Sequence, residues 1–135
     1  MTGPAGVKTI LVVDDDHPTA ELVALFLELE GYAVLTASNG QEALERARGT
    51  VPGLIVTDQR MPVMTGAELF RALKKSPRLR RVPVILMTSA PPAATRDLPW
   101  AELIRKPVDL EHISRVVRRV FLETGESCAS GRRSG

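Results

Sequence analysis

The chain has 135 residues, 44% hydrophobic and 25% charged, and its 18 basic and 16 acidic side chains leave a formal net charge of +2. This length suits one domain with its own core, and this composition excludes a disordered or fibrous chain. The small net charge does not indicate a nucleic-acid or membrane partner, and one cysteine, Cys128, excludes an internal disulfide.

The first half of the chain reads as strands alternating with helices. Residues 10–13 are an apolar, β-branched run that ends in three aspartates, which suits a strand buried on both faces. A helix is predicted from Pro18 to Gly31, and its apolar residues at helical spacing are Leu22, Leu25, Phe26 and Leu29. Residues 33–36 predict a second strand, and residues 41–48 a second helix.

The second half continues the alternation. Residues 54–58 predict a third strand that ends in Asp58, and residues 67–75 predict a helix. A fourth strand is predicted at residues 82–87 and a fifth at residues 103–105. The last helix is expected at residues 110–123. We expect disorder at residues 1–7 and in the Gly-, Ser- and Arg-rich tail at 124–135, so that one domain spans residues 8–123.

Polar side chains follow four of the five predicted strands. Alternating strands and helices imply a parallel sheet with helices on both faces, and the site in such sheets lies at the carboxyl ends of the strands. The residues expected at this edge are Asp14, Asp15, Asp58, Thr88 and Lys106.

These residue types suit phosphoryl chemistry. Clustered carboxylates repel unless a cation joins them, and oxygen ligands favour Mg²⁺. Lys106 adds a second positive charge and Thr88 a hydroxyl, while the carboxylate of Asp58 suits a nucleophile that forms an acyl-phosphate. Asp16 is expected only to cap the helix that follows it.

Four segments together resemble the receiver domain of two-component response regulators. The resemblance covers about residues 8–123, and its most specific part is the Asp-x-x-Met-Pro-x-Met-x-Gly string at residues 58–66. The other matching segments are the run at residues 10–16 with its acidic end, the strand and Thr88-Ser89 at residues 83–89, and Lys106-Pro107.

This resemblance implies a flavodoxin-like α/β fold, doubly wound, with five parallel strands in the order 2-1-3-4-5. It implies that Asp58 accepts a phosphoryl group from a histidine kinase or phosphotransfer protein. It also implies that Mg²⁺ is held by Asp14, Asp15, Asp58 and the backbone carbonyl of Arg60. Thr88 and Lys106 would contact the phosphoryl group, and the Lys106-Pro107 bond would be cis.

The resemblance therefore predicts a cytoplasmic switch that signals to an unknown downstream protein by contact, without an attached output domain or membrane insertion. Its only catalysis would be its own phosphorylation and dephosphorylation, so it would not be an enzyme acting on a separate substrate.

The chain departs from the family pattern in two places. Residues 89–100 contain three prolines and no apolar stripe, and a proline inside a helix costs about 3 kcal/mol. We therefore predict an irregular or shortened fourth helix, within residues 93–98 at most. Receivers usually carry an aromatic residue three positions before the lysine, and here that position is Leu103.

Two other functions remain open from the residues. A haloacid-dehalogenase-type phosphohydrolase would use Asp14 as nucleophile and Asp16 as acid, but Pro18 stands where that motif wants Thr or Val. A nucleic-acid binder would use the basic clusters, but the chain has few aromatic residues to stack on bases.

Basic residues gather in two segments. One segment holds Lys74, Lys75, Arg78, Arg80 and Arg81, and the last predicted helix carries Arg115, Arg118 and Arg119. Each cluster is either a solvated rim or a docking surface for an acidic partner.

Overall fold

The computed structural model describes residues 7–89, 95 and 97–133. Its sheet has five parallel strands in the order β2-β1-β3-β4-β5, which confirms the predicted order. The strands are β1 (Thr9–Val13), β2 (Ala33–Ala37), β3 (Leu54–Asp58), β4 (Val84–Thr88) and β5 (Glu102–Arg105).

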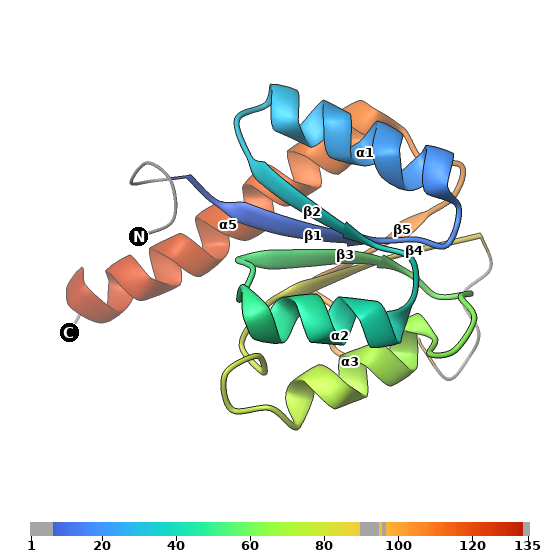
Figure 1. Ribbon diagram of the computed structural model, residues 1–135. Coiled ribbons are helices and arrows are strands. Elements are labelled where there is room, and N and C mark those ends of the chain that lie inside the picture. Colours follow the sequence, from blue (N-terminus) through green and yellow to red (C-terminus); the bar gives the residue numbers. More distant parts are fainter. Residues whose placement is uncertain (1–6, 90–94, 96, 134–135) are drawn as a thin grey trace.

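Helices cover both faces of this sheet (Figure 1). The described helices are α1 (His17–Leu29), α2 (Gly40–Gly49), α3 (Gly66–Lys74) and α5 (Leu110–Arg133). α1 and α5 lie on one face, and α2 and α3 lie on the other (Figure 1). A doubly wound sheet of this kind leaves the carboxyl ends of its strands uncovered by helices.

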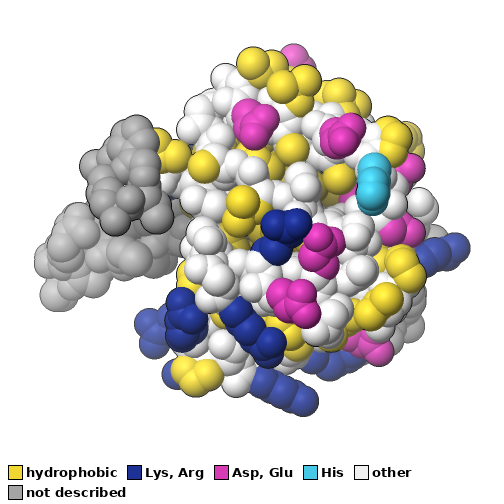
Figure 2. Space-filling view, viewed as in Figure 1, with side chains coloured by type: hydrophobic (Ala, Val, Ile, Leu, Met, Phe, Trp, Pro, Cys, Tyr) yellow, Lys and Arg dark blue, Asp and Glu magenta, His cyan; other side chains and the backbone are white. Residues whose placement is uncertain are grey.

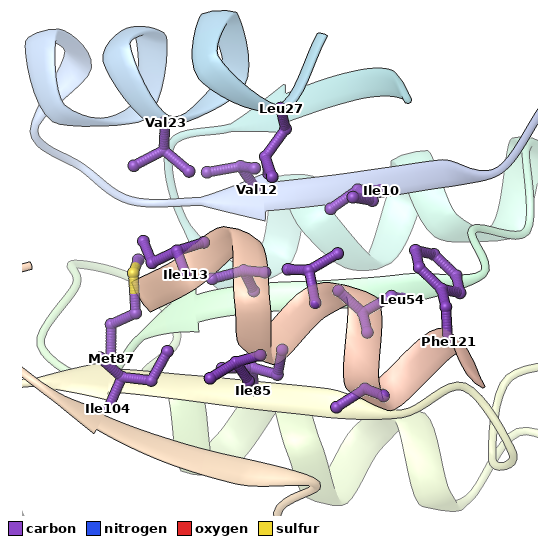
Figure 3. Close-up of a cluster of buried hydrophobic side chains, with 14 of the residues drawn as sticks. Ile10, Val12, Val23, Leu27, Leu54, Ile85, Met87, Ile104, Ile113 and Phe121 are labelled. Atoms are coloured by element: carbon purple, nitrogen blue, oxygen red, sulfur yellow. The ribbon is translucent and has the colours of Figure 1, made fainter. Parts of the chain in front are cut away.

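Alternate side chains of the central strands pack into two separate hydrophobic cores, one on each face of the sheet. Ile10, Val12 and Val56 point toward α1 and α5, where they meet Val23, Leu27, Ile113 and Phe121 (Figure 3). Leu11, Val13 and Ile55 point the other way, toward α2 and α3. Because both faces of the sheet are buried, the strands read as continuous apolar runs in the sequence.

The face of α1 that packs on the sheet is not the apolar stripe from which the helix was predicted. Ala20, Val23, Ala24 and Leu27 are buried. Leu22 and Leu25 are each 54% exposed and Leu29 is 78% exposed, so the stripe points mostly to solvent. The segment is apolar on nearly all sides, and periodicity alone does not select the face that meets β1 and α5.

The predicted end of the last helix was wrong. α5 continues through residues 124–133, which the sequence pattern assigned to a disordered tail. No proline follows Pro107, and the glycines in this stretch weaken a helix without terminating it, since each costs about 1 kcal/mol relative to alanine.

Two other expectations fall on residues outside the described part of the chain. We expected disorder at residues 1–7, but residues 1–6 lie outside the described part of the chain. Val7 is described and is 41% exposed. The fourth helix predicted within residues 93–98 lies largely outside it, since only Thr95, Asp97 and Leu98 of that range are described. Thr95 is helical, and residues 97–100 are turn and irregular chain.

Side chains of different kinds gather over different elements on the face seen in Figure 2. Hydrophobic and acidic side chains gather over α1, and Lys and Arg side chains gather along the edge occupied by α3 and the loop that follows it (Figure 2). No helix in the described part of the chain has the length and hydropathy needed to cross a bilayer.

Candidate functional site

Two carboxylates meet at the uncovered edge of the sheet because β1 and β3 are hydrogen-bonded neighbours. Asp14 follows the last residue of β1, and Asp58 is the last residue of β3. Both are buried, at 1% and 8% exposure, whereas Asp15 beside them is exposed. One ligand oxygen from each of the three lies within 4.8 Å of the others.

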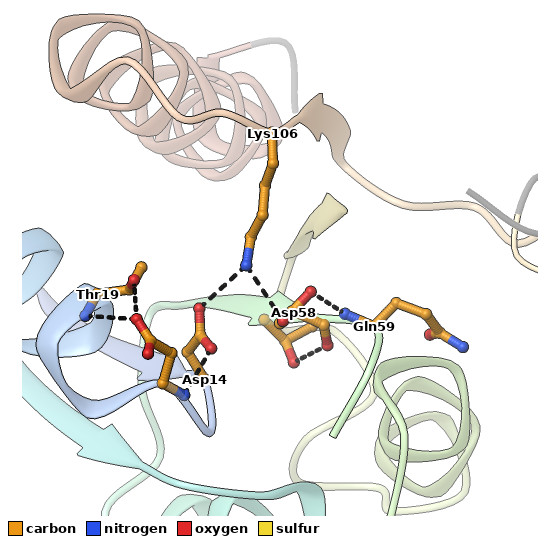
Figure 4. A network of polar contacts seen from close by, with 7 residues as sticks. Asp14, Thr19, Asp58, Gln59 and Lys106 are labelled. Atoms are coloured by element: carbon orange, nitrogen blue, oxygen red, sulfur yellow. Dashed lines mark hydrogen bonds and ion pairs between the residues drawn. The ribbon is translucent and has the colours of Figure 1, made fainter. Parts of the chain in front are cut away.

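Lys106 brings a positive charge between the two buried carboxylates. It directly follows β5, and its backbone amide donates to the carbonyl oxygen of Thr88 at 2.9 Å. Its Nζ lies 3.2 Å from Asp58 Oδ2 and 3.4 Å from Asp14 Oδ2 (Figure 4). The Lys106-Pro107 bond is cis, as the family resemblance implies.

Burial and charge act in opposite directions on this network. Desolvation by burial is the largest influence on Asp14 and raises the pKa of its carboxyl above the ordinary value, although the Asp16 backbone amide and Lys106 both act to lower it. Desolvation also acts to lower the pKa of Lys106, but the nearby charges of Asp14 and Asp58 outweigh it, so the pKa of Lys106 is raised. The lysine therefore stays cationic.

The loop after β3 is held in place by the residues that follow Asp58. The backbone amide of Gln59 donates to Asp58 Oδ1 at 2.8 Å, and the Gln59 side chain accepts from the amide of Ala67 at 2.8 Å. α3 begins with a capping box formed by Thr65 and Glu68. A methyl group at Gly66 would overlap the carbonyl oxygen of Asp58, so the string at residues 58–66 needs glycine at its end.

An open cleft of about 440 Å³ lies over these strand ends. Of the predicted site residues, Asp15, Asp58, Arg60, Thr88 and Lys106 line it, whereas Asp14 lines a neighbouring pocket and contacts Lys106. Thr88 is 5% exposed and ends β4, next to β3. The cleft is large enough to hold a phosphoryl group beside the charged side chains that line it.

Sequence reasoning assigned no role to Gln59 or to Ser89, which also line the cleft. Each directly follows a strand-end residue of the predicted site, and that adjacency is the signal by which they could have been found. Asp16 caps α1 as predicted, since its side chain accepts the Thr19 amide at 3.1 Å. An Asp16 engaged in this way is poorly placed to serve as the acid of a phosphohydrolase.

Leu103, at the position that is usually aromatic in receivers, is half-buried in β5 opposite Leu86. The only tryptophan of the chain, Trp100, lies just before β5 and packs on Phe70 of α3 with ring centroids 4.6 Å apart. Its indole N–H donates to the carbonyl oxygen of Thr95 at 2.6 Å. Trp100 therefore joins the chain after β4 to α3.

The family model of the response regulator receiver domain matches residues 10–118, which include every predicted site residue.

Curated relatives agree with this match. An uncharacterized 14.6 kDa protein in the sodA1 3′ region of Leptolyngbya boryana is 35% identical over 84% of this chain and 89% of its own length. The phosphate regulon transcriptional regulatory protein PhoB of Pseudomonas aeruginosa is 40% identical over 61% of this chain. The chain spans only 36% of that longer relative, so the match concerns one part of PhoB.

Solved structures show the same fold. The signal receiver domain of a signal transduction histidine kinase from Syntrophus aciditrophicus is 34% identical, with a TM-score of 0.79 over 84% of this chain and 89% of that one. The receiver domain of sensor histidine kinase PA1611 from Pseudomonas aeruginosa PAO1 is 24% identical, with a TM-score of 0.76 over 84% and 97% of the two chains. That structure has a magnesium ion coordinated in its active site cleft.

Proposed function

This chain belongs to the response regulator receiver domain family, and we propose that it is a phosphorylation-dependent signalling switch whose phosphoacceptor is Asp58. One observation carries the proposal. Asp58 ends a buried strand at the floor of an open cleft, within 3.2 Å of the Lys106 ammonium and beside two further aspartates.

In the proposed reaction a carboxylate oxygen of Asp58 attacks the phosphorus atom of a phosphohistidine. The phosphorus–nitrogen bond breaks, an acyl-phosphate forms, and the histidine of the donor leaves. Lys106 and the hydroxyl of Thr88 supply positive charge and a hydrogen bond to the phosphoryl oxygens. This chain supplies the acceptor and the charges, and a histidine kinase or phosphotransfer protein supplies the phosphoryl group.

The donor set also fits Mg²⁺. Three carboxylates with ligand oxygens within 4.8 Å of one another form an all-oxygen group of the kind that binds hard cations. We propose that Asp14, Asp15, Asp58 and the backbone carbonyl of Arg60 hold the ion, which would offset the negative charge of an incoming phosphoryl group. The positive charge of the ion would also offset the free-energy cost of burying the Asp14 carboxylate in its charged form.

The exposed leucines of α1 suit the docking of a phosphodonor. Leu22, Leu25 and Leu29 recur at three- and four-residue spacing, which is the pattern that packs against another helix. Leu22 also lines a small apolar pocket that reaches Lys106, a residue of the cleft, so this end of the leucine surface lies near the site. We propose that a helical donor docks here, in the cytoplasm, and that the phosphorylated protein signals by contact with a further protein.

Labelling with a small phosphodonor tests the proposal. The chain is incubated with acetyl phosphate and Mg²⁺, and the acyl-phosphate is located by mass spectrometry. We expect the label on Asp58, its loss in Asp58→Asn, and its retention in Asp97→Asn, a matched change at an exposed aspartate. Turnover that depends on Asp14 while Asp58 stays unlabelled would overturn the switch in favour of a phosphohydrolase.

A further inference from the structure

A compact group of cations lies on the opposite side of the molecule from the α1 leucines. We call it the α3 basic surface and define it by six exposed residues: Arg48, Lys74, Lys75, Arg78, Arg80 and Arg81. They come from the end of α2, the end of α3 and the loop between α3 and β4. Figure 2 shows Lys and Arg side chains gathered along this edge.

The five cations that α3 and its following loop contribute to this surface have no acidic neighbours in sequence, whereas Arg48 lies three residues after Glu45. No Asp or Glu occurs between Glu68 and Asp97. Among the described residues, the cations that form ion pairs are Arg46, Lys106, Arg118 and Arg119, and none belongs to this surface. Clustered like charges repel one another, so an anionic partner would stabilise this arrangement.

Side chains of this surface donate hydrogen bonds to backbone carbonyls of the loop and of α2. Lys74 Nζ donates to the carbonyl oxygen of Arg80 at 2.8 Å and lies 4.8 Å from the centre of the Phe70 ring. Arg78 donates to the carbonyl oxygen of Arg48 at 3.2 Å, and Leu79 between the arginines is 1% exposed. A loop that is already ordered loses little conformational entropy when it binds a partner.

This surface lies away from the cleft. α3 begins at Gly66, beside Asp58, and runs to Lys74, so its end and the following loop lie where β4 begins rather than where it ends (Figure 1). A partner bound there leaves the cleft and the α1 leucines open.

We propose that the α3 basic surface docks an acidic segment of a partner protein, rich in Asp and Glu, whether or not Asp58 is phosphorylated. Arginine predominates on the surface, and its planar guanidinium pairs with carboxylates through two parallel hydrogen bonds. The docking would hold the switch beside a partner while phosphoryl transfer proceeds at the other edge of the sheet.

Other polyanions fit the surface less well. Stacking on bases requires exposed aromatic rings, but Phe70 is 3% exposed and Trp100 packs against it. Entry into a membrane interface requires exposed apolar side chains, and the exposed large ones in the described chain lie outside α3 and its following loop. A net charge of +2 also gives a weak overall field for attracting a long polyanion.

Binding of a labelled peptide tests this proposal. Fluorescence anisotropy follows the titration of a fluorescein-labelled dodecapeptide of alternating Glu and Ser with the whole chain. We expect Arg80→Glu/Arg81→Glu to weaken binding by at least about tenfold, or about 1.4 kcal/mol. The control Lys8→Glu/Arg115→Glu makes the same change in net charge at exposed cations elsewhere and is expected to bind as the wild type does.

The remaining measurements separate this docking from the phosphorylation switch and from other partners. Asp58→Asn should bind the peptide as tightly as the wild type, and Arg80→Glu/Arg81→Glu should still be labelled by acetyl phosphate and melt at the wild-type temperature. Equal weakening in the Lys8/Arg115 control, absence of peptide binding, or tighter binding to duplex DNA or phosphatidylglycerol vesicles than to the peptide would each overturn the proposal.

Discussion

The ammonium of Lys106 lies 3.2 Å from Asp58 Oδ2 and joins two strand ends that are 48 residues apart in the chain. The same ammonium contacts Asp14, so one lysine faces both buried carboxylates. Its raised pKa keeps it charged at neutral pH, although burial acts to lower that pKa. The lysine therefore supplies charge to the floor of the cleft before any phosphoryl group arrives.

Replacing Lys106 by alanine should slow the labelling of Asp58 by acetyl phosphate about 10²-fold, because a positioned charge at the transition state is lost. The rate is measured by mass spectrometry over time. Lys75→Ala removes an exposed lysine from the far side and should leave the rate unchanged. Equal rates in wild type and Lys106→Ala would show that this lysine takes no part in the reaction.

Replacing Asp14 by asparagine should stabilise the protein at neutral pH without divalent ions, by roughly 1 kcal/mol. Burial raises the pKa of Asp14, so the folded state holds the proton more tightly than the unfolded state does. Stability of the wild type is therefore lost as pH rises from the ordinary value of 3.8 through the raised pKa of the folded state.

Urea unfolding at a series of pH values measures this difference. The advantage of Asp14→Asn should shrink at acidic pH, where the wild-type carboxyl is already neutral. Mg²⁺ should raise the melting temperature of the wild type more than that of the variant, because an ion that binds only the folded state stabilises it. An Asp14→Asn variant that is less stable at neutral pH would contradict the account.

Replacing Gly66 by alanine should destabilise the fold by about 1–3 kcal/mol, since the new methyl group overlaps backbone at the end of β3. Gly49→Ala is the matched control, because nothing lies within 4 Å of the methyl group that it adds. Denaturant unfolding compares the two variants. The account fails if both shift the midpoint equally.

Replacing Val63, in the segment that follows Asp58, by glycine should stabilise the fold by about 0.5 kcal/mol. Val63 has a φ of 70°, which is costly for a β-branched residue, and it is 77% exposed, so little buried surface is lost. Gly31→Ala, at a φ of 103°, should have the opposite sign. Unfolding midpoints of both variants check the pair.

Replacing Leu25 by aspartate should reduce phosphoryl transfer from any histidine kinase that phosphorylates the wild type, by about tenfold or more. The reason is that the apolar contact of Leu25 with the docked kinase would be lost. Labelling by acetyl phosphate should be unaffected, because this donor needs no docking surface. Leu122→Asp is a matched change at a leucine 56% exposed on α5. Slower labelling by both donors would indicate a structural defect in place of lost docking.

Much of the fold followed from short-range pattern. Strands buried on both faces are continuous apolar runs, and each run ends where the first polar group reaches the uncovered edge, as at Asp14 and Asp58. The parallel arrangement then places those ends together, so the strand pattern predicts the carboxylates, Thr88 and Lys106 at one edge of the sheet.

The sequence could not decide which side of α1 is buried or where α5 ends. α1 carries apolar residues on nearly all sides, so the buried face is chosen by contact with β1 and α5, and Leu25 is left in solvent. Residues 124–133 carry weak local preferences, and α5 runs through them as a continuation of the helix packed on the sheet.

The sequence by itself determined which polar residues follow the strands, and therefore which residue types are available for phosphoryl chemistry at that edge of the sheet. Only the tertiary structure decided that Lys106 contacts both carboxylates, that the α1 leucines face solvent, and that Arg78 donates to the backbone carbonyl of Arg48. The physical reason is range: strand patterns arise between neighbours in the chain, whereas these contacts depend on how the sheet brings distant segments together.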